Sequence, residues 1–518
     1  MTQVQVGDVV VLADAAEAAA AQNHSMWNED LRPCSLAEHS WPASKFASLW
    51  IGMCICLPTY SLAASMIALG MNWWEAVLTI LVGSTIVMGA ILLVSHAGTK
   101  FGIPYPVFAR LWFGTRGAHV PALARAVIAA GWFGINSWFA GQALDAILTR
   151  IVPSWTGLSW HLGIAFAIFW AVNVLIAMRG PQAIGRLAQV SAPTLAVGAI
   201  ALFVWAIHAT GGFGPLLAQP AKIHGSAFWA SFAPSVVGVI AFWATLALNI
   251  PDYTRYATSQ RAQVRGQIFS MPLTMALFSF VGIVVTSATV AVFGTALWNP
   301  VELIVKFPTP VVVIAGIIII LSSVTINVGA NVMAPARAFE NLAPKHVTFA
   351  LGAIFTGLLS LVMQPWYLLS SFTNYIFVWL GAYGAMLGAF DGIAIADYWL
   401  VRKRRLDLAQ LYAPKGVYGY AGGVNPFALA ALAIGWLLAI GGAVALDPHH
   451  PWAGGLNGFF TRVSSGGWVL SLAGGLAAYA LLMQGSRSRI SQQEYDAITR
   501  VETHLPHPDV TWAAPEVP

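Results

Sequence analysis

Eleven long stretches of this chain contain no Asp, Glu, Lys or Arg, and they constrain the fold more than any other feature. They cover residues 46–74, 76–99, 126–144, 151–178, 187–221, 223–251, 266–301, 307–336, 346–390, 416–446 and 463–486. A hydrocarbon layer about 30 Å thick is crossed by roughly 20 apolar residues in an α-helix. Each stretch is therefore long enough for at least one membrane crossing.

The stretch 346–390 has room for two crossings, and Gln364-Pro365-Trp366 near its middle is typical of a turn between helices. We therefore predict an all-α integral membrane protein with twelve transmembrane helices, whose solvent is membrane lipid. Charged residues make up only 9% of the chain, against roughly 25% in soluble proteins, which excludes a soluble globular fold. The sequence has no HExxH and no GxxxxGK[ST] motif, so we expect neither a metalloenzyme nor an ATP-driven pump.

The basic residues are distributed unevenly over the predicted loops. With the N-terminus placed inside, only Arg150, Lys222, Lys306 and Arg462 of the 25 Lys and Arg residues fall on the outer side. An excess of Lys and Arg marks the cytoplasmic loops of membrane proteins. We therefore place both termini in the cytoplasm, in a cell inner (plasma) membrane. The same distribution explains the net charge of +5 without a nucleic-acid partner.

Trp132 and Asn136 are the most informative polar positions inside the stretch 126–144. Asn136 lies near the middle of that stretch, hence near the bilayer midplane, and Trp132 lies four residues earlier on the same helix face. An indole and an amide at this depth could bind a flat, hydrogen-bonding molecule. Alternatively, Asn136 bonds a neighbouring helix and Trp132 only packs.

Residues that weaken helices occur in two stretches, one in each half of the chain. They are Gly52 and Pro58 in the first stretch and Pro234 and Gly238 in the stretch 223–251. Interruptions in corresponding helices of two halves indicate a midplane site in inverted-repeat transporters. Phe242 and Trp243 follow the second interruption and are candidates for that site.

Polar and acidic residues in the second half give two further expectations. Ser323, Asn327 and Asn331 form a stripe at spacings of four, which serves either ligand binding or contact between helices. Asp391 and Asp397 follow the end of the stretch 346–390, where the expected role is that of solvated helix ends. The sequence therefore predicts no buried acid that could carry a proton.

Six motifs in order carry a resemblance to a known family. They are HAGTKFGIPYPVFAR (96–110), RGAHVPALARA (116–126), GWFGINSW (131–138), FWATLALNIPDYTRYA (242–257), NVGANVMAPA (327–336) and DYWLVRKRRLDLAQLY (397–412). The sequence resembles the nucleobase:cation symporter-1 family, in particular its bacterial allantoin, hydantoin and uracil permeases. The resemblance begins at Asn28-Glu29-Asp30-Leu31 and ends near Tyr412.

The resemblance implies a five-plus-five inverted repeat of the leucine-transporter type, with helices 1 and 6 broken at the substrate site. The expected parts are a cytoplasmic tail (1–44), helices 1–5 (45–210), helices 6–10 (223–400), helices 11 and 12 (416–486) and a second cytoplasmic tail (487–518). Both tails are polar and carry no motif, and we expect them to be disordered.

The family's substrate residues carry over by position. Trp132 and Trp243 match the two tryptophans that stack on the substrate ring, Asn136 lies at the amide position of helix 3, and Asn331 matches the substrate-binding Asn of helix 8. Phe242 and Cys56 complete the predicted substrate site. Cys56 is a departure, because relatives carry Gln or Asn at that position.

The family's sodium site is conserved only in part. The resemblance assigns it to backbone carbonyls of Gly52, Ile55 and Ser322 and to the hydroxyl of Thr325. The second hydroxyl of the family's site is missing, because Ile326 takes its position. The coupling ion is therefore H⁺ or Na⁺, and we expect no cofactor.

The sequence thus predicts a secondary active transporter, not an enzyme. It would import a small planar nucleobase or ureide heterocycle, such as allantoin, hydantoin or uracil, by cation-coupled alternating access, and function as a monomer. Two alternatives remain at this stage. One is a carrier of the same fold for an amino acid or a quaternary amine, and the other is a membrane-embedded sensor or enzyme.

Overall fold

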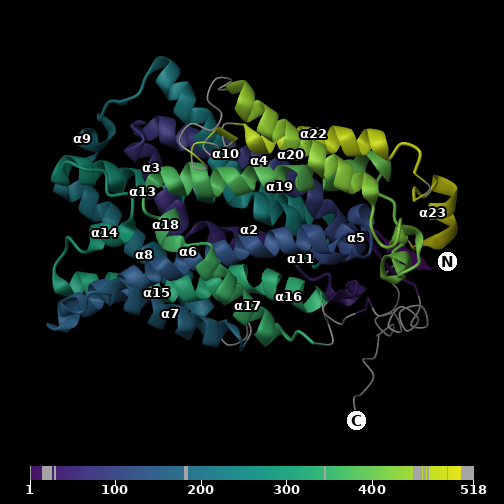
Figure 1. Ribbon diagram of the computed structural model, residues 1–518, viewed down its shortest axis with the longest axis horizontal. Helices are drawn as coiled ribbons and strands as arrows, with labels where there is room; N and C mark the ends of the chain where they lie inside the picture. Colours follow the sequence, from purple (N-terminus) through teal and green to yellow (C-terminus); the bar gives the residue numbers. More distant parts are fainter. Residues whose placement is uncertain are drawn as a thin grey trace, which may run out of the picture.

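Helices running roughly along one axis make up most of the molecule (Figure 1). The computed structural model describes residues 2–13, 26–27, 31–179, 185–342, 346–446, 455, 458, 462–463, 466–486 and 488–502. Asn28, Glu29 and Asp30, where the family resemblance begins, lie outside the described residues, as do Lys345 and Arg487.

The first half of the chain folds into helices that occupy the first five predicted spans, with one further short helix over Tyr105–Phe113, between the second and third spans. They are α2 (Ala43–Cys54), α3 (Leu57–Ala68), α4 (Trp73–Phe101), α5 (Tyr105–Phe113), α6 (His119–Ile151), α7 (His161–Ala177), α8 (Gly185–Ala209) and α9 (Phe213–Leu217). A capping box begins α4, because the Asn72 side chain accepts from Glu75 N at 3.0 Å while the Glu75 carboxylate accepts from Asn72 N at 2.9 Å.

The second half contains more irregular helices, several of them short or continued by π-helical turns. They are α10 (Gly225–Asn249), α11 (Pro251–Thr254), α12 (Gln260–Ile268), α13 (Ser270–Phe293), α14 (Pro300–Ile304), α15 (Thr309–Ile326), α16 (Met333–Leu342), α17 (Phe349–Val362), α18 (Pro365–Leu368) and α19 (Gly381–Ile395). Three π-helical turns, η5 (Asn327–Val332), η6 (Asn374–Leu380) and η7 (Ala396–Val401), continue or precede them. Gln364 adopts φ 49°, so the turn predicted at Gln364-Pro365-Trp366 is confirmed.

The remaining elements follow these helices or lie at their ends. They are the helices α20 (Pro426–Leu446), α22 (Gly467–Leu482) and α23 (Gln492–Ile498), the 3-10 turns η2 (Leu36–Glu38), η3 (Trp155–Gly157), η8 (Ala409–Tyr412) and η9 (Val417–Gly419), and the strands β1 (Gln3–Val6), β2 (Val9–Leu12) and β3 (Thr499–Glu502). α22 packs closely on α19 because Gly388 and Gly392 have no side chain: a Cβ there would overlap the backbone of Trp468 or Leu472.

By length and composition, five helical segments in the described chain are suited to cross a membrane. They are Trp73–Phe101, Gly225–Asn249, Gln260–Phe293, Thr309–Glu340 and Asn374–Val401. The bent pair α2 and α3 makes a sixth, shorter apolar helices lie in five further predicted spans, and the long helix α6 covers the remaining one, 126–144. The helical membrane fold is thus present, while the total of twelve crossings stays a prediction.

The two helices expected to be broken differ from each other. α2 and α3 meet at an angle of 58° across Ile55 and Cys56, which fits a broken helix 1. The predicted break in helix 6 is wrong, because α10 is continuous from Gly225 to Asn249. Pro234 removes one backbone N–H, but every residue from Pro234 to Asn249 is buried, so packing holds the helix together.

The described parts of the two tails form a small β-sheet, so the prediction of disordered tails is wrong there, while the described chain is mostly helical, as an all-α membrane fold requires. β1 pairs antiparallel with β2 and parallel with β3, in the order β2-β1-β3. The Gln3 side chain fixes this sheet to the loop after η7, since it donates to Leu406 O at 3.2 Å and accepts from Leu408 N at 3.1 Å. The two tails therefore lie on the same side of the molecule.

The acidic residues that follow the stretch 346–390 are buried, so the prediction of solvated helix ends is wrong for them. Asp391 lies inside α19 with no exposed surface and accepts from Trp468 Nε1 of α22 at 3.2 Å. Asp397 in η7 is also fully buried and pairs with Arg402, with 2.8 Å between Oδ2 and Nε. The predicted ends were misplaced because the helix continues through η7 to Val401.

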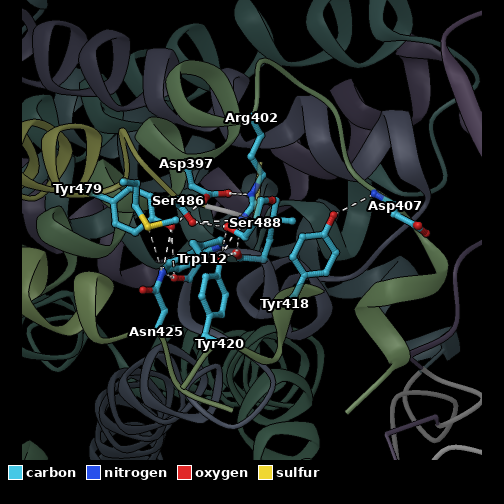
Figure 2. Close-up of polar contacts among 12 residues, drawn as sticks. Trp112, Asp397, Arg402, Asp407, Tyr418, Tyr420, Asn425, Tyr479, Ser486 and Ser488 are labelled. Carbon is cyan, nitrogen blue, oxygen red and sulfur yellow. Dashed lines mark hydrogen bonds and ion pairs between the residues drawn. The ribbon is translucent and has the colours of Figure 1, made fainter. Parts of the chain in front are cut away.

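Figure 2 shows the polar network around the Asp397–Arg402 pair. Tyr479 of α22 donates to the second carboxylate oxygen at 2.6 Å. Arg402 also donates to Leu111 O of α5 at 2.9 Å and to the Tyr420 hydroxyl at 2.6 Å. Because Asp397, Arg402 and Tyr479 are buried and bonded to one another or to neighbouring groups, the network ties η7, α5 and α22 together.

Reporter fusions should place both tails in the cytoplasm. Fusions after Arg405 and Arg489 should both report cytoplasm, because the inner side carries the excess of Lys and Arg, and a fusion after Lys222 should report the outside. The β1–β3 pairing requires the first two to agree. An outside signal from either of them would contradict this orientation.

Replacing Asp397 by Asn should destabilise the protein, because it leaves the Arg402 guanidinium buried without its counter-charge. Breaking a buried ion pair in this way costs about 3–5 kcal/mol. The thermal midpoint of the purified protein should fall clearly. Lys403→Gln, at an exposed position in the same loop, is the matched control and should leave the midpoint unchanged.

Candidate substrate site

A cavity of about 390 Å³ lies where α2, α3, α6, α10, α15 and η5 meet. The ten residues that the sequence assigns to substrate or cation all line it: Gly52, Ile55, Cys56, Trp132, Asn136, Phe242, Trp243, Ser322, Thr325 and Asn331. These residues come from segments of the chain almost 280 positions apart, and the fold brings them to one place. No acidic side chain lines the cavity among the residues that the structure describes.

The gap between α2 and α3 shapes one wall of the cavity. Cys56 N donates to Cys54 O at 3.0 Å, so the helical ladder is interrupted before Gly52 O receives its usual partner. Cys56 then caps α3 with extended backbone, and its Sγ lies 3.2 Å from the Thr59 hydroxyl. Tyr375 of η6 donates to Pro58 O at 3.1 Å and so contacts the start of α3, next to the gap.

Three aromatic rings form the apolar part of the cavity. The Phe242 ring contacts both indoles, with centroids 5.1 Å from Trp132 and 4.9 Å from Trp243, each edge to face. Trp379 packs against Trp132 at 5.9 Å, which requires Gly131 because a Cβ there would overlap the Trp379 ring. The Trp243 indole Nε1 is buried and has no hydrogen-bond partner in the described part of the chain.

The two asparagines present amide groups beside these rings. Asn136 donates to Trp132 O at 3.0 Å, and its buried Oδ1 has no partner among the described residues. Asn331 donates to Asn327 Oδ1 at 2.9 Å. Asn327 itself bonds Phe133 O and the Ser137 hydroxyl, each at 3.1 Å, and so connects η5 to α6. Within the stripe, Asn327 therefore makes the contact between helices, while Asn331 lines the cavity and its role in ligand binding stays a prediction.

The predicted cation residues lie on two facing walls. Gly52 and Ile55 belong to the end of α2, while Ser322 and Thr325 belong to α15. The Thr325 hydroxyl donates to Leu321 O at 2.9 Å, which leaves its oxygen lone pairs free to accept. Ile326 lines the same cavity and adds hydrocarbon where a hydroxyl would supply a further ligand.

The chain matches the family model described as "permease for cytosine/purines, uracil, thiamine, allantoin" over residues 33–460. It is 40% identical over 432 residues to the purine-uracil permease NCS1 of Arabidopsis thaliana, covering 81% of this chain and 72% of that protein. It is 38% identical over 431 residues to the allantoin permease of Bacillus subtilis (strain 168), covering 81% and 88% respectively. The chain belongs to the nucleobase:cation symporter-1 family.

A solved structure of this family supports the assignment. Mhp1, a nucleobase-cation-symport-1 transporter in a closed conformation with bromovinylhydantoin bound, is 25% identical and gives a TM-score of 0.71 over 91% of this chain and 98% of that one. The resemblance found in the sequence is thereby confirmed. This member of the family is a multi-pass plasma-membrane transporter and not an enzyme.

Sequence reasoning missed five polar residues that line the cavity: Ser48, Arg125, Ser191, Thr245 and Tyr253. Arg125 was assigned to an inner loop because it precedes an uncharged stretch. α6 begins at His119, so Arg125 is inside the helix, and only 5% of its surface is exposed. Its spacing of seven from Trp132 and eleven from Asn136 is a one-face pattern that could have revealed it.

Proposed function

We propose that this transporter imports a small planar heterocycle, a nucleobase or a ureide such as allantoin, hydantoin or uracil, through the cavity described above. One observation carries the proposal: aromatic faces and incompletely bonded amide and indole groups line the same cavity. A flat ring with alternating N–H and C=O groups complements such a lining. The similarity to a purine-uracil permease and to an allantoin permease supports the substrate class.

In this proposal, each part of the cavity has one task. Trp132 and Trp243 supply apolar area to the two faces of the ring, with Phe242 beside them. The amides of Asn136 and Asn331 each donate and accept, and so orient the polar edge. Cys56 offers only a weak sulfur partner at a position where relatives have an amide, which favours ligands with fewer polar groups on that side.

The cavity lining argues against a quaternary amine or an amino acid as substrate. Acids, carbonyls and aromatic faces can all bind a cationic group, but the described lining contains the Arg125 guanidinium, which repels a cation, and no acid that would offset it. The cavity also lacks, among the described residues, a nucleophile with an adjacent base of the kind that covalent catalysis requires. Transport without chemical change to the ligand is the reading that fits both features.

We further propose that the transporter works by alternating access around this cavity, as a monomer with both tails in the cytoplasm. Residues 45–210 and 223–400 would be its two inverted repeats. The broken pair α2 and α3 supports this, because a helix interruption beside a ligand is the usual pivot region in such transporters. α10 is the counterpart of this pair, and its continuity means that the two halves are not structurally equivalent.

Replacing an aromatic wall of the cavity should weaken ligand binding. Trp132→Ala or Trp243→Ala removes one face of the site and should cost roughly 1–3 kcal/mol, about 5- to 150-fold in affinity. Asn331→Ala should also lose affinity, because the ring edge loses a partner. The measurement is ligand-induced quenching of tryptophan fluorescence with allantoin, hydantoin and uracil.

Trp73→Ala is the control for these variants, since Trp73 packs on Phe280 and does not line the cavity. It should bind ligand normally. Normal quenching in all three cavity variants would place the site elsewhere.

Sodium coupling should be weak or absent. The inherited site offers four oxygen ligands, from Gly52, Ile55, Ser322 and Thr325. A hard cation needs several oxygens around it, and this site lacks the hydroxyl that Ile326 replaces. Uptake into cells or proteoliposomes should persist when choline replaces sodium, and should collapse when a protonophore removes the pH gradient.

Ile326→Thr tests the same point in the opposite direction. It restores the missing hydroxyl and should increase the sodium dependence of uptake. Strict sodium dependence of the unmodified protein, abolished by Thr325→Ala, would contradict the prediction while leaving the ring-binding site intact.

A further inference from the structure

The cavity has two layers, because α6 and α10 run antiparallel beside each other. In one layer, the Trp132 and Phe242 rings are in contact. Seven residues earlier on α6 and seven later on α10, Arg125 Nε donates to Asn249 Oδ1 at 3.2 Å. Seven helical residues correspond to about 10 Å along each helix, so the polar layer lies two turns from the aromatic one. Arg125 and Tyr253 line the cavity at this second layer.

The guanidinium of Arg125 is buried but only partly bonded. Its Nη1 atom is buried and has no hydrogen-bond partner among the residues described. The nearest acid, Asp252, does not pair with it directly: the carboxylate accepts from Tyr105 N at 2.7 Å and from Asn249 Nδ2 at 3.4 Å. Asn249 therefore stands between the cation and the acid.

A buried guanidinium with unused donors is costly unless something bonds it during the working cycle. The structure offers one such place, the cavity that Arg125 lines. A charged residue within a membrane-spanning helix usually faces a water-filled path and has a function there. A merely anchoring arginine would have its remaining N–H groups satisfied by protein atoms.

We propose that Arg125 forms a second subsite of this cavity, which binds the carbonyl-bearing or deprotonated imide edge of the heterocycle. This inference rests on the function proposed above and adds a rule of selectivity to it. A guanidinium can only donate hydrogen bonds. It therefore binds a ligand with a ring carbonyl, which accepts them, and disfavours a ligand with an amine at the same position. The transporter should therefore prefer oxo-substituted heterocycles to their amino-substituted counterparts.

The competing explanation gives Arg125 a purely architectural role in holding Asn249, Asp252 and the start of α5. In that case a substitution would weaken every ligand alike and lower thermal stability. A selective subsite instead changes the ratio of affinities within a matched pair of ligands. Uracil and cytosine form such a pair, as do hypoxanthine and adenine, because within each pair a carbonyl is exchanged for an amine.

The experiment measures binding of these four compounds by tryptophan quenching, and their inhibition of labelled uracil or allantoin uptake. The unmodified protein should bind the oxo member of each pair more tightly. Arg125→Gln, which can also accept hydrogen bonds, should reduce that preference roughly 10- to 100-fold, the range expected for a hydrogen bond to a charged group. Arg125→Lys keeps a donor-only cation and should retain most of the preference.

An unchanged ratio of affinities within a pair in Arg125→Gln, or equal losses of affinity for both members of a pair, would overturn the subsite. If Arg125→Gln does not fold, equal affinity of the unmodified protein for uracil and cytosine would overturn it as well. Failure of the unmodified protein to bind any heterocycle, allantoin and hydantoin included, would instead overturn the proposed function, and the subsite with it.

Discussion

Hydrocarbon provides no hydrogen-bond partners, so a chain in a membrane must satisfy its backbone within its own helices. In this transporter, two departures from regular helical bonding adjoin the same cavity: the gap between α2 and α3, and the π-helical turn η5. Irregular backbone is tolerated there because the cavity can hold water or ligand in place of lipid. The position of the site thus follows from where the helices could be interrupted, and the side chains add selectivity to it.

Much of the site could be predicted from the sequence, whereas several parts of the fold could not. Depth, spacing and helix interruptions pointed to Trp132, Asn136, Phe242, Trp243 and Asn331, and the family resemblance added Cys56 and the cation residues. Those methods read local patterns. The unbroken α10 depends on burial along its whole second half, and the burial of Asp397 depends on Tyr479, 82 residues away. Arg125 was assigned to a loop because a charged residue beside an uncharged stretch is typical of a loop. The sequence pattern did not reveal that α6 begins earlier, at His119.

Electrostatics connects the two proposals made for the cavity. Arg125 lines the same space as the carbonyls and hydroxyl assigned to the cation. Two positive charges in a medium of low dielectric repel each other much more strongly than in water. A permanent guanidinium would therefore disfavour a bound sodium ion and favour an electron-rich ligand edge. The loss of one hydroxyl at Ile326 and the presence of Arg125 act in the same direction.

The small sheet of the two tails has a consequence for the order in which the molecule can be completed. Gln3 of β1 donates to the Thr499 hydroxyl of β3, across 496 positions of the chain. During synthesis, β1 can pair with β2 at once, but its other edge stays open until nearly the whole protein has left the ribosome. An open strand edge attracts other chains. Closure of this sheet is thus a late event in biogenesis, and it marks a chain that has been made to its last helix.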